Sequence, residues 1–132
     1  MKTLKIALIG CGWIGTSHAR ALNNIQMCYG ADIVPELEVV IDVFEETAKK
    51  VAERYGFNRF STNPDDAFND PSIDIVYITT PNQLHVEQVQ KAAAAGKAIF
   101  CEKPLGMDGA DAKKAFDAVK EYNTTSMVGF VY

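Results

Sequence analysis

Three groups of residues have the types and spacing that nucleotide-dependent chemistry requires. The first is Gly10-Cys11-Gly12-Trp13-Ile14-Gly15, which matches the pattern G-x-G-x-x-G. The others are Thr79-Thr80-Pro81-Asn82 and Glu102-Lys103-Pro104, and the carboxylate of Asp42, between the first group and the second, is a further candidate. Glycine turns bind phosphate through backbone N–H groups, carboxylates bind ribose hydroxyls, and a lysine can stabilise negative charge on a substrate oxygen. The glycine turn and Asp42 point to a nucleotide site, whereas from position alone the other two groups can equally be ordinary turns, the second with a solvated Glu-Lys pair.

The glycine turn leaves an apolar run and enters a stretch of helical period. In that setting Gly10 permits the tight turn, Gly12 lets the backbone approach a pyrophosphate, and Gly15 lets the helix lie close to the strand. The N–H groups around Trp13 and Ile14, together with the helix dipole, then offer a site for the anion. A plain tight turn is the alternative interpretation, but the order strand, turn, helix favours the nucleotide site.

Asp42 lies near the end of the second predicted strand, where dinucleotide-binding folds place the acid that binds ribose hydroxyls. It lies further past Gly15 than the usual distance of about 20 residues, and we attribute the excess to an extended loop over residues 27–35. A solvated aspartate at the end of a strand is the competing interpretation. The glycine turn favours the cofactor role.

The residues after Asp42 bear on the choice between NAD and NADP. Glu45 and Glu46 follow closely, and no arginine is at hand to bind a 2′-phosphate. Two nearby carboxylates would repel that phosphate. The sequence therefore predicts NAD as cofactor, with NADP less favoured.

Apolar runs of strand length alternate with amphipathic stretches, which is typical of βαβ units and a parallel sheet. Strands are expected at residues 4–9, 38–43, 59–62, 74–79, 97–101 and 126–131. A short helix is expected over residues 64–69, and Asn82 is expected to cap the helix that follows it. The other expected helices have inward-facing stripes at Ile14, His18, Ala21, Leu22 and Ile25; at Ala48, Val51, Ala52 and Tyr55; at Val86, Val89 and Ala93; and at Ala112, Ala115, Phe116 and Val119. We predict an α/β fold of the Rossmann type: a doubly wound, mostly parallel six-stranded sheet with helices on both faces.

Bulk composition limits the other possibilities. The chain has 132 residues, 48% of them apolar and 23% charged, which suits one globular domain over residues 1–132. A net charge of −4 argues against nucleic acid as a partner. Three cysteines without C-x-x-C spacing suggest neither a disulfide framework nor a metal site. No segment approaches the roughly 20 apolar residues of a membrane span, so we expect a cytoplasmic protein without a membrane partner.

The ordered set GCGWIGTSHARAL, DIVYITTPNQLHVEQVQKAAAAGK and FCEKPLG resembles the N-terminal domain of the Gfo/Idh/MocA family of oxidoreductases. The resemblance covers nearly the whole chain, and the Glu-Lys-Pro motif is its most specific part. It implies a pyrophosphate at the three glycines of the turn, the adenosine ribose at Asp42, and a catalytic lysine at Lys103. It also implies a cis bond between Lys103 and Pro104. On the nicotinamide side it implies cofactor contacts from the Thr79 turn and from Thr80, Pro81, Asn82, His85 and Glu102.

The resemblance further implies hydride transfer between nicotinamide and a hydroxyl of a sugar, inositol or related polyol. Family members carry acid/base residues in a second domain, which we expect to lie outside this chain. The isolated chain is then expected to bind NAD without turnover, and the full-length protein to form a homo-oligomer. The alternative is a stand-alone NAD-binding regulatory module without catalysis. We interpret His18 as packing, and Cys11 and Cys101 as small buried residues.

Overall fold

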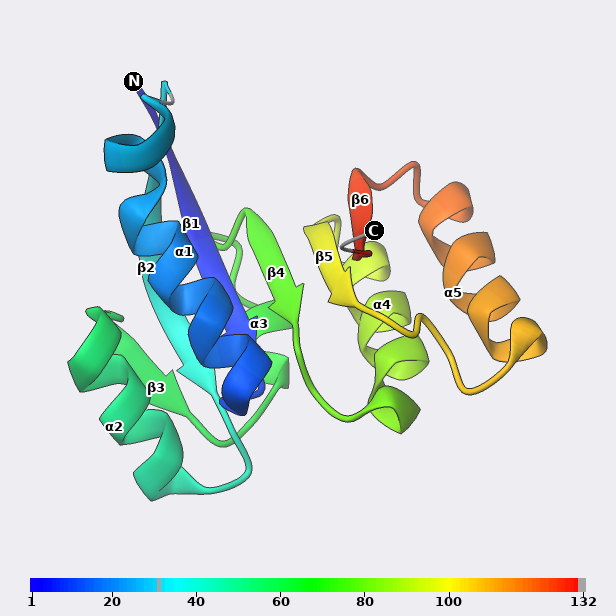
Figure 1. The fold of residues 1–132 in the computed structure, drawn as a ribbon. Helices are drawn as coiled ribbons and strands as arrows, with labels where there is room; N and C mark the ends of the chain where they lie inside the picture. The colour runs from blue at the N-terminus through cyan, green and yellow to red at the C-terminus, as the bar shows by residue number, and fades with distance from the viewer. Residues whose placement is uncertain (31, 131–132) are drawn as a thin grey trace.

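The computed structural model describes residues 1–30 and 32–130 and contains one parallel sheet of six strands (Figure 1). The strand order is β3-β2-β1-β4-β5-β6, which confirms the predicted doubly wound topology. The strands are β1 (Lys2–Ile9), β2 (Ile33–Ile41), β3 (Arg59–Ser61), β4 (Ile75–Ile78), β5 (Ala98–Glu102) and β6 (Ser126–Gly129).

Helices cover both faces of this sheet. The helices α1 (Trp13–Tyr29) and α2 (Glu45–Tyr55) pack on one face, and α3 (Asp65–Phe68), α4 (His85–Ala94) and α5 (Gly109–Glu121) pack on the other. A short 3₁₀ turn, η1 (Asn82–Leu84), precedes α4. In Figure 1, α1 lies in front of β1 and β2, while α4 and α5 lie toward the β5–β6 end. Within the part of the chain that the structure describes, no helix is long and apolar enough to cross a membrane.

The second half of β1, residues 6–9, is continuously apolar because it is covered on both faces. Ile6 and Leu8 belong to the core under α1 and α2, whereas Ala7 and Ile9 belong to the core under α3, α4 and α5. Successive side chains of a strand point to opposite faces, so a strand that is covered on both sides needs apolar residues at every position.

The strand register brings the candidate site together. Ile9, the last residue of β1, pairs with Ile41 of β2 and with Ile78 of β4, and Ile78 in turn pairs with Cys101 of β5. The next residues along each strand are therefore Gly10, Asp42, Thr79 and Glu102, and they form a row along one edge of the sheet. Parallel strands all present their carboxyl ends at this edge, where open α/β sheets bind ligands.

The predicted loop over residues 27–35 is wrong. Helix α1 continues to Tyr29 and ends at Gly30, which has φ +57°, and β2 already begins at Ile33. Pro35 is tolerated inside β2 because β3 pairs only with Val39–Ile41, so β2 is an edge at that point. The longer helix and strand, rather than a loop, account for the distance from Gly15 to Asp42.

Four smaller expectations also need correction. Ala21 is exposed and Ala19 is buried in its place, and Phe116 is 60% exposed while Ala115 and Ala118 face the core. Asn82 does not cap a helix, because η1 intervenes and Leu84 is the residue before α4. Strand β6 ends at Gly129, and the predicted strand residue Val131 lies outside the described residues.

Candidate functional site

The glycine turn is packed against neighbouring backbone. Gly10 has φ +99°, and a Cβ on it would lie 2.6 Å from the carbonyl oxygen of Thr79. A Cβ on Gly15 would lie only 2.0 Å from the carbonyl oxygen of Gly10. Both positions therefore require glycine, one for its backbone conformation and both for the close approach of other backbone atoms.

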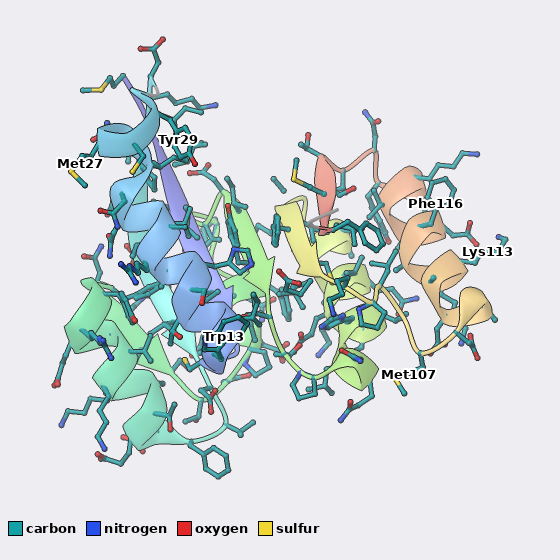
Figure 2. All side chains as sticks on the ribbon, in the orientation of Figure 1. Trp13, Met27, Tyr29, Met107, Lys113 and Phe116 are labelled. Atoms are coloured by element: carbon teal, nitrogen blue, oxygen red, sulfur yellow. The ribbon has the colours of Figure 1, made fainter. Side chains whose placement is uncertain are left out.

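Gly12 differs from these two glycines. A Cβ built on it would meet nothing within 4 Å, so the protein itself leaves this position open. Helix α1 begins at the next residue, Trp13, and its first turn contains no acidic residue. Figure 2 shows Trp13 at the N-terminal end of α1, where its side chain is 84% exposed. The free amides at this end can accept an anion that approaches over Gly12.

Asp42 braces the glycine turn. Its Oδ2 accepts a hydrogen bond from the Cys11 N–H at 2.9 Å, and its Oδ1 accepts one from the Phe44 N–H at 3.0 Å. The carboxylate is half-buried and directly follows β2. Each carboxylate oxygen has a second lone-pair direction, so acceptor capacity remains for a ribose hydroxyl.

Two adjoining hollows follow the row of strand ends. An open groove of about 470 Å³ is lined mainly by the glycine turn and the loop after β2. A cavity of about 250 Å³ extends from it between the ends of β1 and β2, η1 and α4. Both hollows share Gly10, Asp42, Thr80 and Pro81. Such a mostly apolar hollow with a few polar groups suits a nucleotide.

The two threonines after β4 have internal partners. The Thr79 hydroxyl lies 2.8 Å from the Gly10 carbonyl oxygen and 3.0 Å from that of Ile9, so it holds β4 against the glycine turn. The Thr80 hydroxyl donates to Oε1 of Gln88 at 2.6 Å. Thr79 is buried, whereas Thr80 lines both hollows. Of the two, Thr80 is the better placed to contact a ligand.

His85 is fully buried at the start of α4 and connects two turns. Its Nε2 lies 2.8 Å from the Thr80 carbonyl oxygen, and its Nδ1 lies 2.7 Å from the Pro104 carbonyl oxygen. Both partners are acceptors, so both contacts are hydrogen bonds only when each ring nitrogen carries a proton. His85 therefore fastens the turn after β4 to the turn after β5. The structure thus shows two backbone partners for the imidazole, and the cofactor contact that the resemblance implies at His85 stays a prediction.

The turn after β5 carries the exposed Lys103 beside the buried Glu102. The Lys103 N–H donates to Oε2 of Glu102 at 3.2 Å, and Oε1 of Glu102 lies 2.7 Å from Nε2 of His18. The bond from Lys103 to Pro104 is cis, as expected. Sequence analysis interpreted His18 as a packing residue and did not anticipate this contact with Glu102. Its position on the partly buried stripe of α1 gave no sign of a carboxylate partner two strands away.

The buried cysteines beside the motifs are not activated thiols. Burial, aided by the nearby Asp42 carboxylate, raises the pKa of Cys11 to about 12. Burial, aided by Glu102, raises the pKa of Cys101 likewise to about 12. A thiol with so high a pKa is a poor nucleophile at neutral pH. Within residues 1–30 and 32–130, no group of His, Cys, Asp and Glu side chains is arranged to hold a metal ion.

The topology, the glycine turn and the acid after β2 define a dinucleotide-binding domain of the Rossmann type. Residues 4–130 match the model of the GFO_IDH_MocA oxidoreductase family, described as an NAD-binding Rossmann fold. The chain belongs to this family.

Individual relatives agree with that assignment. Over 100% of its own length the chain is 39% identical to levoglucosan dehydrogenase of Pseudarthrobacter phenanthrenivorans. Over 97% of its own length it is 36% identical to scyllo-inositol 2-dehydrogenase (NAD(+)) of Bacillus subtilis. It covers 34% and 36% of those proteins, about a third of each. Among solved structures, levoglucosan dehydrogenase in complex with NADH and levoglucosan matches with a TM-score of 0.92 at 38% identity. That match covers 96% of this chain and 34% of the other.

Proposed function

We propose that this chain is the cofactor-binding part of an NAD-dependent dehydrogenase that acts on a hydroxyl of a sugar, an inositol or a related polyol. The observation that carries the proposal is the row formed by Gly10, Asp42, Thr79 and Glu102 at the carboxyl ends of four neighbouring strands, with Lys103 next to it. A domain that only had to fold would not need this set at one edge.

The open space over Gly12 fits a pyrophosphate, and its amide partners are those of Trp13 and Ile14. Gly10 and Gly15 shape that turn. The half-buried Asp42 has acceptor capacity left for the adenosine ribose. On the nicotinamide side we assign contacts to the residues after β4 and β5: Thr79, Thr80, Pro81, Asn82, His85 and Glu102. His85 and Thr79 contribute by holding the turns in place, since their polar atoms already have backbone partners.

With NAD held by the glycine turn and Asp42, its nicotinamide would supply a hydride acceptor for the carbon that carries the substrate hydroxyl. We assign to Lys103 the catalytic role at that hydroxyl. Its ammonium group can polarise the oxygen and stabilise the negative charge that develops as the proton leaves. Lys103 is exposed, as a group that meets substrate must be.

NAD is favoured over NADP because three carboxylates lie near the ribose position. Asp42 follows β2, and Glu45 and Glu46 form the exposed first turn of α2. A 2′-phosphate placed against Asp42 would be repelled. The relatives named for levoglucosan and scyllo-inositol support a polyol as the class of substrate. A cytoplasmic location, a homo-oligomeric full-length protein, and the absence of nucleic-acid or membrane partners complete the proposal.

The test compares two assays. The 132-residue chain is titrated with NADH, and the complete gene product is assayed for NADH formation with a panel of sugars and inositols. We expect binding in the first assay and turnover in the second, and Lys103→Met should remove turnover at least about a thousandfold while NADH still binds. Turnover that survives Lys103→Met would contradict the catalytic assignment. Binding without turnover on any polyol would favour the regulatory alternative.

A further inference from the structure

Two side chains that are far apart in sequence meet behind the turn that carries Lys103. His18 lies in the second turn of α1, and Glu102 ends β5. Their side chains are 21% and 11% exposed, and Nε2 of His18 lies 2.7 Å from Oε1 of Glu102. A carboxylate so shielded from water needs hydrogen-bond donors from the protein. His18 supplies one of them from a different element.

The other sides of this carboxylate are also fixed. Oε2 accepts the Lys103 N–H at 3.2 Å. On the side of β6, a Cβ on Gly129 would lie 2.7 Å from Oε1 and 2.9 Å from Cδ, so the carboxylate lies directly against this glycine. The carboxylate of Glu102 is thus enclosed by α1, by β6 and by the backbone of its own turn.

The imidazole of His18 is itself held by aromatic packing. Its ring meets Phe100 edge-on at 4.8 Å between centroids and lies 5.7 Å from the ring of Tyr77. Tyr77 and Phe100 stack on each other at 4.9 Å. These rings come from β4 and β5, so the sheet determines where the donor of His18 points.

We propose that His18 is a positioning residue for Lys103 and acts through Glu102. By fixing the Glu102 carboxylate, His18 fixes the backbone N–H of Lys103, and with it the direction in which the lysine side chain leaves the turn. The proposal rests on the proposed function, because it deepens the role given there to Lys103. It also connects α1, which begins at the glycine turn, to the turn that carries the reactive lysine.

Amide hydrogen exchange of the isotope-labelled chain tests this directly, with Thr79 as the internal reference. The Thr79 N–H donates to Ile9 at 2.9 Å between central strands and reports on the fold as a whole. His18→Phe keeps an aromatic ring but removes the donor. His18→Gln places an amide nitrogen where Nε2 was. Arg20→Gln, on the exposed face of the same helix, is the matched control.

We expect His18→Phe to speed exchange at Lys103 about tenfold relative to Thr79. His18→Gln should stay within about twofold of the unmodified chain, and Arg20→Gln should not change it. Three results would overturn the proposal: no acceleration in His18→Phe, equal acceleration in His18→Phe and His18→Gln, or an acceleration that Thr79 shares. The measurement needs no nucleotide. Failure of the chain to bind NADH would therefore contradict the proposed function, whereas the exchange rates would still test whether His18 positions the Lys103 N–H.

Discussion

On the β1–β2 side of the site the geometry is set mainly by backbone, whereas on the β4–β5 side it is set by buried side chains. A Cβ on Gly10 or Gly15 would lie 2.6 Å or 2.0 Å from a backbone oxygen, which is closer than a Cβ can approach. On the β4–β5 side, His85 and the His18–Glu102 pair hold the turns after β4 and β5. A short motif is therefore enough to specify the β1–β2 side, whereas the β4–β5 side depends on residues far apart in the sequence.

The largest effect should follow from breaking the backbone side. Gly15→Ala places a Cβ against the carbonyl of Gly10 and the hydroxyl of Thr79, so we expect a loss of at least about 3 kcal/mol in the free energy of unfolding. Gly12→Ala is the matched control, because its Cβ meets nothing, and should cost less than about 1 kcal/mol. Urea denaturation measures both. Similar losses in the two variants would show that close backbone contact does not distinguish these glycines.

Breaking the side-chain side should cost somewhat less. His85→Leu leaves the carbonyls of Thr80 and Pro104 without their buried donor, for an expected loss of about 2–4 kcal/mol in the free energy of unfolding. The exposed neighbour Glu87 provides the control, since Glu87→Gln loses only a surface ion pair with Lys91, worth under about 1 kcal/mol. Urea denaturation is again the measurement. A loss below about 1 kcal/mol for His85→Leu would mean that water or other groups replace the histidine without difficulty.

The smallest effect concerns the two buried thiols, one beside each side of the site. With pKa values of about 12, Cys11 and Cys101 are thiolates to only on the order of one part in 10⁴ at pH 8. A thiol reagent should therefore modify the exposed Cys28 first and the other two at least about a hundredfold more slowly.

Raising the pH sharpens this prediction. Below pH 12, each rise of one pH unit increases the thiolate fraction of Cys11 and Cys101 about tenfold. Their modification should therefore accelerate as the pH rises, provided that the chain stays folded. Cys28→Ser should abolish the fast phase. Equal rates for all three thiols would contradict the burial of Cys11 and Cys101 in the structure.

Features set by neighbouring residues can be predicted from the sequence, whereas features set by tertiary contacts cannot. The alternation of strands and helices, the glycine turn and the strand-end position of Asp42 follow from local patterns, because each involves neighbouring residues. Gly30 and Pro35 misled the prediction: Gly30 ends helix α1, and Pro35 is tolerated inside β2 because the short β3 pairs only with Val39–Ile41. The roles of His18 and His85 could not be predicted, because their partners are set by tertiary packing and by the cis turn at Pro104.

In the proposed function, the amides of the glycine turn hold a diphosphate while Asp42 holds the sugar attached to it. Calorimetric titration of the folded chain with NADH and with NADPH, repeated on Asp42→Ala, tests this most directly. We predict that the unmodified chain binds NADH at least about tenfold more tightly than NADPH, and that Asp42→Ala removes most of this preference. Absence of heat with either nucleotide, or NADPH bound as tightly as NADH by the unmodified chain, would contradict the claim.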